Sequence, residues 1–120
     1  MALMSGRSRR DELLPRFLNG VSAMALSAEK SLAGRLAFAV DQVAVFTVED
    51  FPSELRPKYA ELMRLFDSAR VPSVAKNHPL WQRRVPVYYL HWTKARRAAE
   101  LLVELFEALV RARPSPEEHA

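Results

Sequence analysis

The stretch that decides the fold is "SLAGRLAFAVDQVAVFTVEDFPSELRPKYAELMRLF", residues 31–66. Ser31 can begin a helix that runs to about Phe46, because a serine side-chain oxygen satisfies free backbone amides at a helix start. Apolar side chains cover almost the whole circumference of this helix, so we expect it to lie centrally. The β-branched run "VAVFTV" could instead form a strand, but the chain offers no convincing second strand to pair with it.

The second part of the stretch predicts a turn followed by another helix. Asp50 or Ser53 supplies a capping oxygen, and the prolines fall where an early helical turn loses few hydrogen bonds. Apolar residues then recur at steps of four and three, which predicts a helix with one buried face. The residues on this face are Leu55, Tyr59, Leu62, Phe66 and Ala69.

Beyond this stretch, three prolines in residues 71–86 predict a loop, and a long helix is predicted from Pro86 to about Arg113. One sector of that helix is polar, and the remainder is apolar. Such a wide apolar arc exceeds the stripe of a surface helix, so we expect it to pack against several neighbours or a second subunit. The interface residues expected from this arc are Trp92, Leu102, Phe106 and Leu109.

Towards the N-terminus, helical spacing of apolar residues predicts a further helix that starts near Asp11. Residues 1–10 are expected to be a flexible basic arm, residues 11–113 a single helical domain, and residues 114–120 a disordered tail. The predicted fold is therefore all-α, a bundle of about four helices with a long C-terminal helix. We expect the chain to form a homo-oligomer, because so much apolar surface lies on the last helix.

Composition excludes several classes of function. The chain has no cysteine, which removes disulfides and thiolate chemistry and favours a reducing compartment such as the cytoplasm. No apolar tract is long enough to span a membrane, and no export signal is recognisable. The histidines are widely separated and no glycine-rich phosphate loop exists, so neither a metal nor a cofactor is expected. An enzyme is accordingly the less favoured reading.

The net charge of +4 is less informative than its distribution. No acidic residue lies between Asp67 and Glu100, whereas this window holds seven basic residues together with tryptophan, tyrosine and histidine. This mixture favours binding of nucleic acid or another polyanion through residues 70–97. Tyr88 and Trp92 are expected to turn inward, which leaves Trp81 as the best stacking candidate. The candidate binding residues are Lys76, Trp81, Arg83, Arg84, Lys94, Arg96 and Arg97.

Two alternatives stay open beside nucleic-acid binding. The apolar arc of the last helix would suit a protein-interaction or oligomeric accessory subunit, or an antitoxin-like partner. The spacing of Arg84 and His91 resembles the Arg-to-His motif of HEPN-domain ribonucleases, which implies charge stabilisation by the arginine and proton transfer by the histidine. The chain departs from that motif with Val85 in place of a polar residue, and Pro86 lies between the pair. A hydrogen-bonded core histidine is the alternative role of His91.

A second resemblance covers Ser31 to Phe66. Its "RL" within a helix, the acidic "DFP" turn, "ELR" and a following helix resemble small uncharacterised bacterial helical proteins. The resemblance implies two helices joined by a turn at Asp50 to Ser53, and a bacterial origin. It implies no function.

Overall fold

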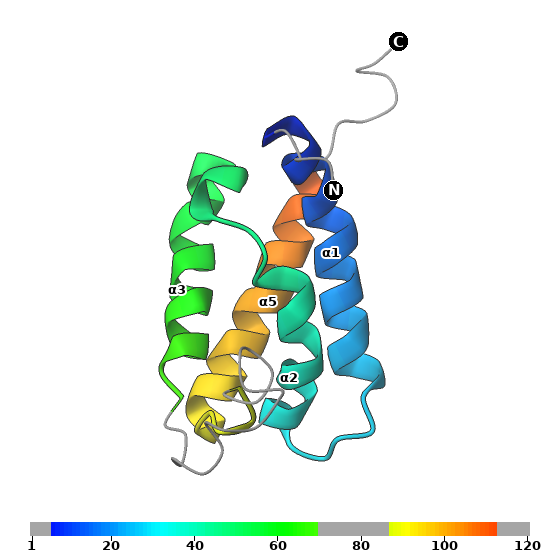
Figure 1. The fold of residues 1–120 in the computed structure, drawn as a ribbon, viewed down its shortest axis with the longest axis vertical. Helices are drawn as coiled ribbons and strands as arrows, with labels where there is room; N and C mark the ends of the chain where they lie inside the picture. The colour runs from blue at the N-terminus through cyan, green and yellow to red at the C-terminus, as the bar shows by residue number, and fades with distance from the viewer. Residues whose placement is uncertain (1–5, 70–86, 113–120) are drawn as a thin grey trace.

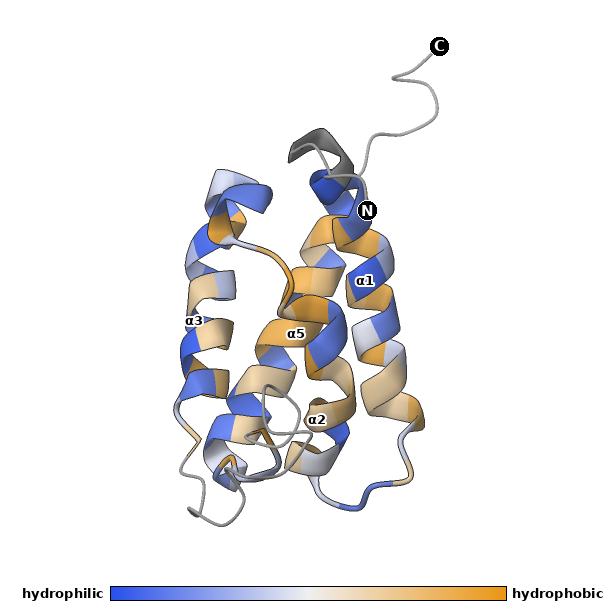
Figure 2. Cartoon of the chain, viewed as in Figure 1, coloured by the Kyte–Doolittle hydropathy of each residue, from blue (hydrophilic) through white to orange (hydrophobic). Residues whose placement is uncertain are grey.

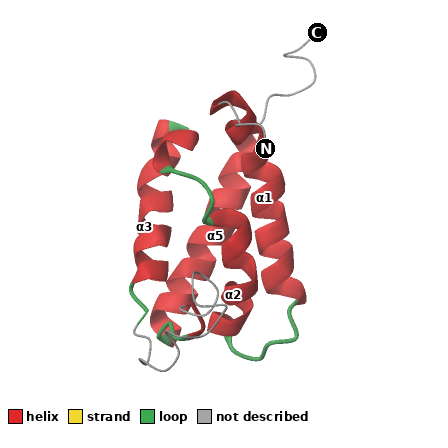
Figure 3. Ribbon diagram, viewed as in Figure 1, coloured by secondary structure: helices red, strands yellow, loops and turns green. Residues whose placement is uncertain are grey.

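The computed structural model describes residues 6–69 and 87–112, with side chains from Arg9 onward. Helix α1 spans Gly6–Leu26, α2 spans Leu32–Val43, α3 spans Arg56–Asp67 and α5 spans Trp92–Ala112. Two short 3-10 turns, η1 (Val48–Asp50) and η2 (Ser53–Leu55), connect α2 to α3. The described residues contain no strand, which confirms the predicted all-α bundle with a long C-terminal helix (Figures 1 and 3).

Helix α5 holds the bundle together because it contacts α1, α2 and α3. Figure 1 shows it running between α3 and α1, and Figure 2 shows hydrophobic residues concentrated along its second half. Much of the predicted arc is therefore buried by the chain's own helices, although Trp92 at the start of α5 is exposed. Leu102 is fully buried and Leu109 nearly so, while Phe106 packs partly buried against the core. The prediction that Leu102 and Leu109 form an interface with another molecule is wrong, since neither offers free surface.

Helix α2 is as central as its composition predicts. The Ser31 side chain accepts a hydrogen bond from the Gly34 amide at 3.0 Å, so the predicted cap is confirmed. The helix ends at Val43, however, three residues before the predicted end at Phe46. The Tyr59 hydroxyl lies within hydrogen-bonding distance of the Val43 and Phe46 carbonyl oxygens, at 2.8 and 2.9 Å. The side chain from α3 therefore satisfies carbonyls that a longer helix would have bonded internally.

Four aromatic rings pack where α1, α2 and α3 meet. They are Phe17, Phe46, Phe51 and Tyr59, all buried. Phe51 stacks on Tyr59 with ring centroids 4.3 Å apart, and Phe17 meets Phe51 edge-on at 5.8 Å. Such offset and edge-on pairs contribute more than the buried area alone. The predicted buried face of α3 is confirmed at Leu55, Tyr59, Leu62 and Phe66.

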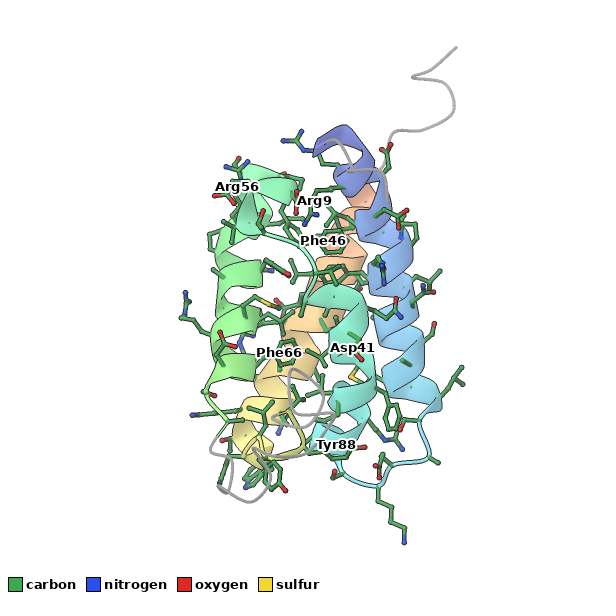
Figure 4. All side chains as sticks on the ribbon, viewed as in Figure 1. Arg9, Asp41, Phe46, Arg56, Phe66 and Tyr88 are labelled. Carbon is green, nitrogen blue, oxygen red and sulfur yellow. The ribbon has the colours of Figure 1, made fainter. Side chains whose placement is uncertain are left out.

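Helix α1 begins at Gly6, so the predicted start near Asp11 is wrong. The cause is Arg9, whose guanidinium binds both carboxylate oxygens of Asp50 at 3.1 Å and the Val45 carbonyl oxygen at 2.8 Å. It also lies 5.9 Å from the centre of the Phe46 ring (Figure 4). An arginine with these partners holds its helical turn in place, although the sequence around it has little to bury.

The C-terminal helix also starts later than predicted. Val87 and Tyr88 are helical, but the chain leaves the helix at Tyr89 and α5 begins only at Trp92. Both Val87 and Leu90 are buried, and they anchor this break to the core. The tail of residues 114–120 lies outside the described residues.

Replacing Asp50 with alanine tests the ion pair by which Arg9 of α1 holds Asp50 of η1. The carboxylate also accepts the Thr47 amide at 2.8 Å, so its removal leaves that amide without its acceptor and the Arg9 guanidinium without its ion-pair partner. We expect the free energy of unfolding to fall by about 2–4 kcal/mol. Urea denaturation measures this fall, and Asp67→Ala at the exposed end of α3 serves as the control, with a change below about 0.5 kcal/mol. An equal loss in both variants would contradict the assignment.

Candidate nucleic-acid interface

The described part of the predicted basic segment lies at the start of α5. His91 caps this helix: its Nδ1 accepts a hydrogen bond from the Thr93 amide at 3.3 Å and lies 2.9 Å from the Thr93 hydroxyl. A neutral imidazole whose Nδ1 accepts a hydrogen bond carries its proton on Nε2. The second ring nitrogen is then a hydrogen-bond donor, which suits an anion rather than a cation.

His91 is exposed, so the prediction of a core histidine is wrong. A capping role explains its hydrogen bonds without any catalysis. Arg84, the other half of the ribonuclease-like pair, lies outside the described residues. The ribonuclease reading therefore stays a prediction.

The aromatic rings in this region point outward, contrary to the prediction. Trp92 exposes 68% of its surface and Tyr89 exposes 43%. The sequence placed Trp92 on a continuous helix with an inward face, but α5 begins at this residue and Ala95, three residues later, takes the buried position of the first turn. Tyr88 is also partly exposed, and its hydroxyl donates to the Glu29 carboxylate at 2.8 Å (Figure 4).

The three candidate arginine and lysine residues on α5 divide into two groups. Lys94 and Arg96 are exposed and form no ion pair with any described residue. Arg97 instead binds the two carboxylate oxygens of Glu61 on α3 at 2.9 and 3.2 Å, and lies 3.6 Å from Glu104. Its charge is therefore neutralised by acids. The prediction that Arg97 is free to bind a polyanion is wrong.

A cleft of about 400 Å³ lies beside this helix start. Its lining joins Ser68, at the end of α3, to Tyr89, His91 and Lys94. The Ser68 hydroxyl donates to the Leu65 carbonyl oxygen at 2.6 Å and ends α3 there. The described residues of the lining contribute hydroxyl, imidazole and ammonium groups but no carboxylate, so the cleft favours a negatively charged ligand.

Sequence reasoning missed Ser68 and Glu61. Glu61 falls on the polar side of α3, but nothing in the sequence indicates that this side meets the polar sector of α5. The remaining candidate residues, Lys76, Trp81, Arg83 and Arg84, lie outside the described residues. Within the described ranges, no group of three or more acidic or histidine side chains is placed to hold a metal ion. No helix there has both the length and the apolar character needed to span a membrane.

The ion pair between Glu61 and Arg97 should make stability depend on pH. The hydrogen bond from Arg97 lowers the pKa of Glu61 below its usual 4.5, with the charges of Arg97 and Arg64 adding to the effect and burial opposing it. A carboxyl whose pKa is lower in the folded state stabilises the fold above the unfolded-state pKa, and this contribution disappears as pH falls through the folded-state pKa.

We therefore expect Glu61→Gln to lower the urea midpoint at pH 7, and the difference from the parent chain to be smaller at pH 3. The difference will be small because both side chains are partly exposed. Glu107→Gln, at an exposed acid on α5, is the control and should leave the midpoint unchanged at both pH values. A constant difference between the Glu61→Gln variant and the parent across this range would contradict the expected linkage.

Comparison with known proteins does not identify a relative. No protein-family model, no curated protein and no solved structure matches the chain. The resemblance of residues 31–66 to small bacterial helical proteins therefore stays a prediction, as does a bacterial origin. What this chain binds has to be inferred from its own side chains.

Proposed function

We propose that this chain binds nucleic acid through the start of α5, without catalysing a reaction. The observation that carries the proposal is a pair of exposed cations near the start of α5, Lys94 and Arg96, which form no ion pair with any described residue. Lys94 also lines the cleft at His91. Cations in a fold often find acidic partners, as Arg97 does with Glu61. Lys94 and Arg96 have no acidic partner among the described residues, which favours binding of an external anion.

Electrostatics at this end of the bundle supports the same ligand. The start of an α-helix carries roughly half a positive charge from its aligned peptide dipoles, which adds to the charge of Lys94. The nearest acids in sequence are Asp67 and Glu100, so the segment between them contributes only positive charge. Phosphates, repeated along a nucleic-acid strand, would be neutralised by such a surface.

Contacts to phosphates alone carry no sequence information, so we expect binding with little sequence preference. Lys76, Arg83 and Arg84 belong to the same acid-free segment and are proposed to add further phosphate contacts. The absence of cysteine favours a cytoplasmic location. An accessory subunit or antitoxin-like partner is the second candidate, now through exposed Trp92 and Tyr89 rather than through the buried leucines of α5.

Replacing Lys94 and Arg96 together with alanine tests the proposed function. Each lost phosphate contact lowers the steepness of the salt dependence, by about 0.9 for duplex and 0.7 for single strands in the logarithmic slope. The double variant should therefore bind more weakly and show a slope smaller by roughly 1.4–1.8. Fluorescence anisotropy of a labelled oligonucleotide at several salt concentrations measures both.

The matched control replaces two exposed arginines at the opposite end of the bundle, Arg10 and Arg111. It removes the same charge, so it separates a local site from a general effect of net charge. We expect its affinity to stay within about twofold of the parent chain, as is usual for charges far from the contact. Equal losses in the two double variants would locate the binding elsewhere.

A further inference from the structure

Trp92 is the most exposed aromatic residue in the described part of the chain. A tryptophan normally buries most of its large apolar surface, and its exposure here leaves that stabilisation unused. Trp92 is the first residue of α5, and the residues that enter the core on either side of it are Leu90 and Ala95. An aromatic face held outward in this way is suited to receiving another flat ring.

The ring is supported from behind. Trp92 and His91 have ring centroids 5.9 Å apart with planes inclined by 31°. His91 is itself fixed by its two hydrogen-bonding contacts with Thr93. Because these contacts limit the motion of the pair before a ligand arrives, less conformational entropy is lost on binding.

The two exposed cations, Lys94 and Arg96, lie on different faces of α5. With about 100° of rotation per residue, Arg96 lies about 40° from Trp92, one turn further along α5. Lys94 lies about 160° from Trp92 in the other sense, on the side where it lines the cleft with His91 and Tyr89. Arg96 is thus the cation that shares the exposed face of Trp92, while Lys94 lies beside His91 at the cleft.

We infer that Trp92 stacks on unpaired nucleobases, so that the ligand class is single-stranded nucleic acid. In a duplex the base faces are already stacked on their neighbours, and only phosphates remain for Lys94 and Arg96. In a single strand a base is free to lie on the indole while its flanking phosphates reach the two cations. This inference rests on the proposed function. It adds recognition of the bases to the recognition of phosphates by the cations.

The experiment uses the full chain carrying Trp81→Phe, which leaves Trp92 as the sole tryptophan, since the chain has two. The probes are a single strand of about 12 nucleotides, within the range of lengths that such sites cover, the same sequence as a duplex, and base-free polyphosphate. Stacking of a base on the indole should quench the Trp92 fluorescence with the single strand only. Polyphosphate should bind without quenching, through charge alone.

Replacement of Trp92 in the otherwise unchanged chain then measures the contribution of the ring by fluorescence anisotropy. Trp92→Leu should weaken single-strand binding by roughly 5- to 100-fold, while Trp92→Phe, which keeps an aromatic face, should recover most of the affinity. Polyphosphate binding, measured by competition, should be the same for both variants. Circular dichroism checks that helicity is retained; since Trp92 is outside the core, we expect no change.

The outcomes separate the two proposals. Binding of all three probes without quenching, and without an effect of Trp92→Leu, would overturn base stacking and leave the proposed function intact. Failure of all three probes to bind would overturn both. Loss of polyphosphate binding in Trp92→Leu would also overturn stacking, because that ligand has no bases. Trp92-dependent self-association in sedimentation, with no effect on oligonucleotide binding, would assign the ring to a protein contact instead.

Discussion

The pairing of Asp50 with Arg9 is the interaction on which the arrangement of the helices depends. The carboxylate is almost fully buried, and one side chain joins the first turns of α1 to the segment that leaves α2. Burying a charge is costly unless its partners are in place. Here the guanidinium and the Thr47 amide both supply hydrogen bonds, so the corner is stable in one geometry only. The direction in which the chain continues to α3 follows from that geometry.

Tyr59 completes this corner from the other side. Its hydroxyl reaches the carbonyl oxygens of Val43, the last residue of α2, and of Phe46 beyond it, and its ring stacks on Phe51 within the aromatic cluster. The hydroxyl of Tyr59 therefore helps to end α2, and its ring holds α3 against the aromatic cluster. Helix α5 then covers the remaining apolar surface of the three helices.

Periodicity and capping chemistry in the sequence were sufficient to predict α2, α3 and the all-α class, because these depend on neighbouring residues. Ser31 illustrates this, since its acceptor role involves an amide only three residues away. The start of α1 was not predictable in the same way, because Arg9 finds its partner 41 residues further along. Likewise, the interruption before Trp92 depends on the burial of Val87 and Leu90. No periodicity in the sequence predicts this burial.

The candidate site shows the same limit. Lys94 and Arg96 were identified from a stretch without acids, but a stretch without acids in sequence need not lack them in space. Glu61, from another helix, binds Arg97 and removes it from the set of free cations. The outward position of Trp92 was missed because the predicted helix was continuous. Lys94 and Arg96 thus stay exposed and without an ion-pair partner in the described region, and the aromatic platform beside them was found only in the structure.

The extensive contact between α1 and α2 has a consequence for the order in which the molecule assembles. Only residues 27–31 separate these two helices, so the entropy lost in bringing them together is small. Contacts of this kind form early in folding, whereas contacts between distant segments form late. A hairpin of α1 and α2 is therefore the expected nucleus of folding, onto which α3 and α5 condense.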